Sequence, residues 1–124
     1  MATESNAALI QRQLDAYNAK DVDAWLSTYA PDAKQYLQHG DCIAQGHDEM
    51  RTRILQRFAE PRLHARLLSR TVMANIVVDH EVITRNFPEG EGSTEMICVY
   101  EIADGLIAKA SFAFGEKQIF ALRA

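Results

Sequence analysis

The sequence has few of the residues that mark small domains held together by disulfides or metals. It contains two cysteines, Cys42 and Cys98, which lie far apart and belong to no CxxC pair. This excludes a disulfide framework and a metal knuckle, so we expect two reduced thiols, no metal site and no cofactor. Only three prolines and six glycines are present, and they form no linker or low-complexity tract. Residues 1–124 are therefore predicted to form a single domain.

Long apolar runs and an excess of basic charge are also missing. No stretch approaches the length of a membrane span, and the polar start lacks the basic and apolar parts of a signal peptide. The thirteen Lys and Arg residues are scattered among seventeen acidic residues, which gives a net charge of −4. Nucleic-acid binding needs a basic stripe or patch. We therefore expect a soluble, cytoplasmic protein with no membrane or nucleic-acid partner.

The sequence is rich in apolar residues, and three early segments space them as amphipathic helices do. Hydrophobic residues make up 48% of the chain against 24% charged residues, as in a packed globule. The apolar positions recur every three or four residues, and capping residues or prolines bound the segments. The predicted helices cover residues 6–19 with Tyr17 facing inward, residues 21–29 before Pro31, and residues 47–58 before Pro61.

Strands are predicted to follow the helices. After Pro61 the chain consists of β-branched runs separated by short turns, of which Asp104-Gly105 is a strong hairpin signal. Short turns make neighbouring strands antiparallel. The expected strands are 63–73, 76–87, 94–102 and 106–114, preceded by a weaker pair at 34–38 and 42–45, with Gly90-Glu91-Gly92 as a flexible loop. This order of elements predicts an α+β fold.

Several motifs resemble those of the nuclear transport factor 2-like superfamily over nearly the whole chain. They are the tyrosine-bearing first helix, Lys20-Asp21-Val22-Asp23-Ala24-Trp25, Tyr29-Ala30-Pro31-Asp32-Ala33, and Gly46-His47 at the start of a helix. The chain looks most similar to the SnoaL-like and ketosteroid-isomerase-like branch. The resemblance implies a cystatin-like cone, in which a curved, mostly antiparallel sheet wraps around three N-terminal helices and encloses a pocket. It also implies a homodimer, and the apolar Ile97 and Val99 suit such an interface.

The same resemblance implies site residues, and not all of them are present. A ketosteroid isomerase uses a carboxylate base and an oxyanion site made of a tyrosine and a protonated aspartate. Tyr17 matches the oxyanion tyrosine, and Tyr29 resembles a buried tyrosine of the supporting network. The position of the base falls on Leu37, and that of the protonated aspartate falls on Cys98. Steroid isomerisation by that mechanism is therefore disfavoured.

Strand alternation outlines the pocket that the resemblance implies. Residues 96, 98 and 100 share one strand face, and residues 110, 112 and 114 share another. With aromatic residues from the helices they describe an apolar cavity, although packing in a core is the commoner role for any single one. The predicted lining residues are Trp25, Tyr29, Phe58, Met96, Cys98, Tyr100, Phe112 and Phe114.

Two polar features offer candidate chemistry. His39 shares strand parity with Leu37, so it is the candidate base if the strand runs on toward the cavity mouth; otherwise it is a solvated turn residue beside Gly40. Asp79-His80-Glu81 with Arg85 is the densest polar group, and we expect it to form a charge ladder on the sheet surface. The alternative implied by the resemblance is the carboxylate, arginine and carboxylate with which epoxide hydrolases of the superfamily activate water, but the position of the third member falls on Phe112. His64 and Arg70 are expected on an outer sheet face. Cys98 is expected to be an inert buried thiol.

Two functional hypotheses follow from these observations. In the first, the protein is an isomerase- or cyclase-type enzyme that moves a proton on a small apolar carbonyl compound, with Tyr17 polarising an oxygen and His39 as the base. In the second, it is a non-catalytic module that binds a small apolar molecule or only dimerises. The loss of both acidic residues and the mainly aromatic lining favour the second, and turnover of a substrate would separate the two.

Overall fold

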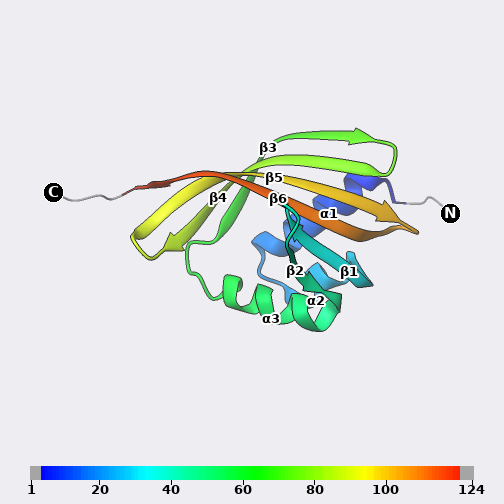
Figure 1. Cartoon of the computed structure of the whole chain (residues 1–124), viewed down its shortest axis with the longest axis horizontal. Coiled ribbons are helices and arrows are strands. Elements are labelled where there is room, and N and C mark those ends of the chain that lie inside the picture. The colour runs from blue at the N-terminus through cyan, green and yellow to red at the C-terminus, as the bar shows by residue number, and fades with distance from the viewer. Residues whose placement is uncertain (1–3, 121–124) are drawn as a thin grey trace.

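The computed structural model describes residues 4–120 and shows three helices packed against one six-stranded sheet (Figure 1). The order of elements is that of an α+β fold, and the helices lie in the first half of the chain. The elements are α1 (Asn6–Asn18), α2 (Val22–Leu26), β1 (Tyr29–Leu37), β2 (Cys42–Gln45), α3 (Gly46–Phe58), β3 (His64–Met73), β4 (Ile76–Phe87), β5 (Gly90–Ala103) and β6 (Leu106–Ile119).

Helix α1 begins and ends where the sequence indicates. The Ser5 hydroxyl accepts a hydrogen bond from the Ala8 backbone N–H at 3.1 Å and caps the first turn. At the other end Lys20 adopts a positive φ of 56°, which stops the helix. Between them Leu9, Ile10 and Leu14 form a buried stripe. The predicted helix over residues 6–19 is confirmed.

Helix α2 is shorter than predicted, and Tyr29 belongs to a strand. Asp21 caps α2 through the Ala24 backbone N–H, but the helix ends at Leu26. The Thr28 carbonyl accepts a hydrogen bond from the Ile107 backbone N–H at 2.9 Å, so the chain pairs with β6 at once. Pro31 lies within β1, where the pairing with β6 is interrupted between Tyr29 and Lys34 and no ladder donor is needed.

The sheet has the order β2-β1-β6-β5-β4-β3, with β1 parallel to β6 and every other pair antiparallel. This confirms a mostly antiparallel sheet. The expected loop at Gly90-Glu91-Gly92 is instead the start of β5. A Cβ on Gly92 would stand 2.4 Å from the Gln118 carbonyl oxygen, so only glycine permits this close approach to β6.

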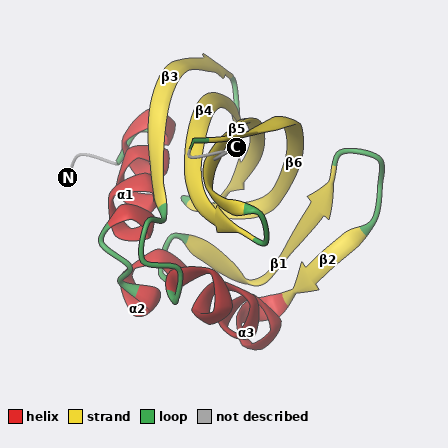
Figure 2. Ribbon diagram, turned by 90° about the vertical axis from the view of Figure 1, so that its left-hand side faces the viewer, coloured by secondary structure: helices red, strands yellow, loops and turns green. Residues whose placement is uncertain are grey.

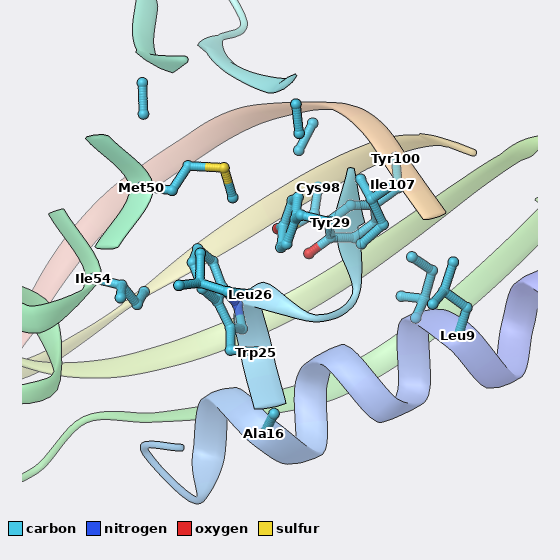
Figure 3. Close-up of a cluster of buried hydrophobic side chains, with 14 of the residues drawn as sticks. Leu9, Ala16, Trp25, Leu26, Tyr29, Met50, Ile54, Cys98, Tyr100 and Ile107 are labelled. Carbon is cyan, nitrogen blue, oxygen red and sulfur yellow. The ribbon is translucent and has the colours of Figure 1, made fainter. Parts of the chain in front are cut away.

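The helices cover the concave face of the curved sheet, which is the predicted cystatin-like cone (Figure 2). Their apolar sides meet the inward side chains of β1, β4, β5 and β6 in one core. In Figure 3, Met50 and Ile54 extend from α3 toward Trp25, while Tyr29 lies beside Cys98 and Tyr100 of β5. The core does not fill the whole interior of the cone.

Candidate functional site

A cavity of about 570 Å³ lies between the helices and the concave sheet. This volume is typical of a site for a small molecule. Aromatic and aliphatic side chains make up about half of its lining, and the rest are one carboxyl group, cationic side chains, amides and hydroxyl groups. The main lining residues are Gln13, Tyr17, Trp25, Tyr29, Leu37, Met50, Arg53, Arg57, Glu81, Arg85, Met96, Tyr100, Phe112, Phe114 and Lys117.

Most of the residues predicted from sequence line this cavity. They are Tyr17, Trp25, Tyr29, Met96, Tyr100, Phe112 and Phe114. Leu37 also lines it, so the position that would hold the isomerase base faces the cavity with an aliphatic side chain.

Two predicted lining residues, Phe58 and Cys98, lie behind the cavity wall. Phe58 packs edge-on against Tyr17, with ring centroids 5.4 Å apart. Cys98 is completely buried. Burial raises the pKa of its thiol well above the ordinary value, so Cys98 remains a neutral thiol as expected.

His39 lies outside the cavity in a solvated turn, which is the second of the two alternatives given above, and not at the mouth, where a base would have to stand. Strand β1 ends at Leu37, and His39 stands in the turn to β2 with its side chain 64% exposed. Its nearest charged neighbour is Asp41 of the same turn, at 3.5 Å. Because the strand ends before His39, the alternation of side chains that would place His39 on the same face as Leu37 does not apply in the turn.

The interior carboxyl groups belong instead to Asp79 and Glu81 of β4. These two residues are 0% and 2% exposed, so the expected surface charge ladder is wrong. Asp79 pairs in register with Cys98, and Glu81 pairs with Met96, which places both acids on the concave face. Glu81 lines the cavity, and its Oε2 atom has no hydrogen-bond partner among the described residues.

Asp79 is neutralised by Arg70 of β3. The Arg70 Nε and Nη2 atoms donate to the two Asp79 carboxylate oxygens at 2.7 and 2.9 Å, a bidentate pair. Arg70 was expected on the outer face with His64, which is exposed. A bulge in the β3–β4 pairing between Leu67 and Ser69 reverses the alternation, so the Arg70 side chain is only 14% exposed.

The environment of Glu81 favours its protonated form. Burial is the main cause that raises the pKa of this carboxyl to about 7, followed by the negative charge of Asp79 and a hydrogen bond with it; the Arg70 charge acts in the opposite direction. Glu81 therefore exists in both protonation states near neutral pH.

Three tyrosines surround the inner part of the cavity as neutral hydroxyl groups. Burial is the main cause that raises the pKa values of Tyr17, Tyr29 and Tyr100 above the ordinary value. The Tyr100 hydroxyl donates to Gln13 Oε1 at 3.4 Å, while the Tyr29 hydroxyl has no partner among the described residues. These hydroxyls can donate hydrogen bonds to an oxygen of a bound molecule.

Arginines and one lysine line the outer part of the cavity. Arg85 donates to both oxygens of Glu60 at 3.1 and 2.8 Å, and Arg57 lies 3.7 Å from the same carboxylate. Among residues 4–120, no three His, Cys, Asp or Glu side chains are grouped as metal ligands, and no helix is long and apolar enough to cross a membrane.

The sequence could have indicated Glu81 through strand register. The turn at Pro88-Glu89 pairs Phe87 with Gly90, and counting back from it places Glu81 opposite Met96. Because directly opposed residues share a face, the prediction that Met96 faces the cavity implies the same for Glu81.

Fold and cavity together define a cystatin-fold protein of the nuclear transport factor 2-like superfamily. The model of the SnoaL-like domain matches residues 10–110, and the chain belongs to that family. A search of curated proteins found no match.

Solved structures support the fold. A cystatin-fold protein from Novosphingobium aromaticivorans is similar at 24% identity and a TM-score of 0.81, covering 88% of this chain and 97% of that one. A candidate SnoaL-like polyketide cyclase from Jannaschia sp. CCS1 has 20% identity and a TM-score of 0.76, with coverage of 88% and 84%. A candidate ketosteroid isomerase from Kribbella flavida has 15% identity and a TM-score of 0.78, with coverage of 98% and 84%.

Proposed function

We propose that the protein is an enzyme that moves a proton on a small, largely apolar carbonyl compound, with Glu81 as the general base and acid. The observation that carries this proposal is a buried carboxyl group with an unpaired oxygen on the wall of an apolar cavity. A carboxylate in such a place is poorly solvated and therefore more basic than one in water.

Each step of the reaction has a residue to perform it. The Glu81 carboxylate removes a proton from the carbon next to the carbonyl group, and the electron pair of the C–H bond moves to the carbonyl oxygen as an enolate. A neutral tyrosine hydroxyl, of Tyr17 or Tyr29, donates a hydrogen bond to that oxygen. In an isomerisation, protonated Glu81 then returns the proton to another carbon. In a cyclisation, the enolate carbon instead attacks a second carbonyl group of the same molecule, and the oxygen of that second carbonyl takes the proton from Glu81.

The names of two similar structures support this reaction class, since a candidate polyketide cyclase and a candidate ketosteroid isomerase both bear names of enolate-forming enzymes. At 20% and 15% identity they support the class only. In this chain the proposed base lies on β4, while Leu37 occupies the position at which the family resemblance implies it.

Two probes test the proposal without knowledge of the natural substrate. Nitrobenzisoxazole reports a general base, because removal of its ring C–H proton breaks the N–O bond and gives a coloured cyanophenolate. Deuterium exchange next to the carbonyl of tetralone reports enolate formation. We expect wild-type protein to accelerate both and Glu81→Gln to lose about a hundredfold or more.

The control is Glu101→Gln, which alters a half-exposed carboxylate paired with Lys109 between neighbouring strands. This variant should retain the wild-type rates. If wild type and Glu81→Gln react at equal rates, Glu81 is not the base.

The absence of a carboxylate at position 37, where the family resemblance implies the base, favours a second candidate function, a binding module without catalysis. Trp25 is the only tryptophan of the chain and lines the cavity, so its fluorescence reports occupancy. Saturable quenching by tetralone with no deuterium exchange above the buffer rate would support this second function and contradict the first.

A further inference from the structure

The outer part of the cavity carries more positive than negative charge. Four cationic residues line the cavity, Arg53, Arg57, Arg85 and Lys117, whereas Glu81 is the one acidic residue of the lining. Glu81 lies on the buried part of the wall and is partly protonated near neutral pH. The cations are therefore balanced only by acids outside the lining.

Two of these cations already have partners. Arg85 makes two hydrogen bonds to Glu60 and also stands over the Phe87 ring, 5.3 Å from its centroid. Lys117 forms an ion pair with Glu89. Their charges are neutralised within the protein, and neither needs a ligand.

Arg57 is only weakly paired. Its side chain is 25% exposed, and its Nε atom lies 3.7 Å from Glu60, too far for a hydrogen bond. Glu60 already accepts from Arg85 and from the Asn86 backbone N–H. The pKa of Arg57 is lowered by burial and then by the Arg85 charge, as expected where positive charge lacks a counter-charge.

Arg53 and Tyr17 extend this region. Arg53 precedes Arg57 by one turn of α3, so both face the cavity, and in the described part of the chain Arg53 forms no ion pair. Tyr17 lines the cavity, and the Arg57 charge acts on its hydroxyl group. Two guanidinium groups and a hydroxyl thus supply hydrogen-bond donors beside an apolar chamber.

We propose that Arg57, with Arg53 and Tyr17, binds the carboxylate of an apolar carboxylic acid whose hydrocarbon body fills the inner cavity. Arg53, Arg57 and Arg85 against Glu60 leave two net positive charges; Arg53 is exposed to solvent, and one carboxylate neutralises the half-buried charge at Arg57. A planar guanidinium also matches a carboxylate in a bidentate pair. The proposal deepens the proposed function, because it makes the substrate an apolar keto acid, but ligand binding at Arg57 does not depend on catalysis by Glu81.

A matched pair of probes tests the carboxylate site. Naphthylacetic acid and naphthylacetamide share the same apolar body and differ in charge at neutral pH. Binding is followed through Trp25 fluorescence and calorimetry. We expect the acid to bind at least about tenfold more tightly than the amide, because a charge-assisted hydrogen bond is stronger than a neutral one. Salt should weaken binding of the acid and leave that of the amide unchanged.

Variants on helix α3 assign the effect to one side chain. Arg57→Gln should abolish the preference for the acid while the amide still binds, and Arg57→Lys should retain part of it. Arg51→Gln is the control, because Arg51 lies on the same helix, pairs with exposed Asp23 and does not line the cavity. Thermal unfolding establishes that each variant is folded. If Arg57→Gln does not fold, a reduced preference of Arg57→Lys for the acid assigns the effect to this side chain.

The outcomes separate this proposal from the catalytic one. Equal binding of acid and amide, binding of neither, or the same loss in Arg51→Gln and Arg57→Gln would each overturn the carboxylate site. Tighter binding of naphthyl phosphate than of the acid would also overturn it, in favour of a phosphate ligand. Glu81→Gln should keep the preference for the acid. If the protein prefers the acid but Glu81→Gln reacts as fast as wild type, only the catalytic proposal fails. If catalysis depends on Glu81 but acid and amide bind equally, only the carboxylate site fails.

Discussion

Replacing Glu81 with glutamine should make the protein more stable at neutral and alkaline pH. In the folded chain the pKa of this buried carboxyl rises to about 7, from an ordinary value of 4.5. The folded state therefore binds the proton more tightly than the unfolded state. The resulting stability is fully present below pH 4.5 and is lost as the pH rises to about 7. Over this range wild-type protein loses about 3 kcal/mol of unfolding free energy through Glu81 alone.

Glutamine has nearly the shape of protonated glutamate, and its amide group can donate to Asp79 as the protonated carboxyl does. Glu81→Gln should therefore equal wild type near pH 4.5 and exceed it by about 3 kcal/mol above pH 7. Urea unfolding followed by Trp25 fluorescence at intervals across this range measures the difference. A difference that does not change with pH would refute the argument that burial and Asp79 raise the pKa of Glu81.

Three further predictions concern the site, the sheet and the assembly. Asp79→Asn should shift the acidic limb of the nitrobenzisoxazole rate profile to lower pH, because the pKa of Glu81 falls when a neighbouring negative charge is removed. Gly92→Ala should lower the melting temperature measured by calorimetry, because its Cβ would meet a β6 carbonyl oxygen at 2.4 Å, whereas Gly115→Ala, with 3.6 Å to its nearest neighbour, should leave it nearly unchanged. We also propose a homodimer through the outer sheet face, so light scattering should give twice the chain mass and Ile97→Asp should give a monomer; a monomeric wild type would contradict this.

The sequence predicted the elements that depend on local chemistry. The first and third helices have regular apolar spacing and defined ends, and both are present within a residue or two of the expected bounds. The long strands after Pro61 are also present. Strand β1 began earlier than expected because pairing with β6, a segment far along the chain, overrode the local pattern at Tyr29.

The candidate site was predicted less well, because its polar residues depend on register and on an irregularity. Apolar lining residues have a recognisable pattern, since large apolar side chains with helical spacing, such as Trp25, or with strand alternation, such as Tyr100, tend to be buried. Arg70 faces inward only because of the bulge after Leu67, and a bulge has no reliable signal in a single sequence. Without that arginine, two acids on the concave face would carry uncompensated charge, so a surface location was the reasonable expectation.

The two carboxyl groups of β4 therefore have different roles because only one of them has a cationic partner. Arg70 donates two short hydrogen bonds to the Asp79 carboxylate oxygens. The charge of Asp79 then acts on Glu81 and, together with burial, moves the titration of Glu81 to near neutrality. A carboxyl group whose pKa is raised to near neutrality by burial and a neighbouring charge is suited to act as a general base and acid. Burial and the Asp79 charge disfavour ionised Glu81 in the folded chain, so the same two causes lower its stability at high pH and give Glu81 the basicity that the proposed reaction requires.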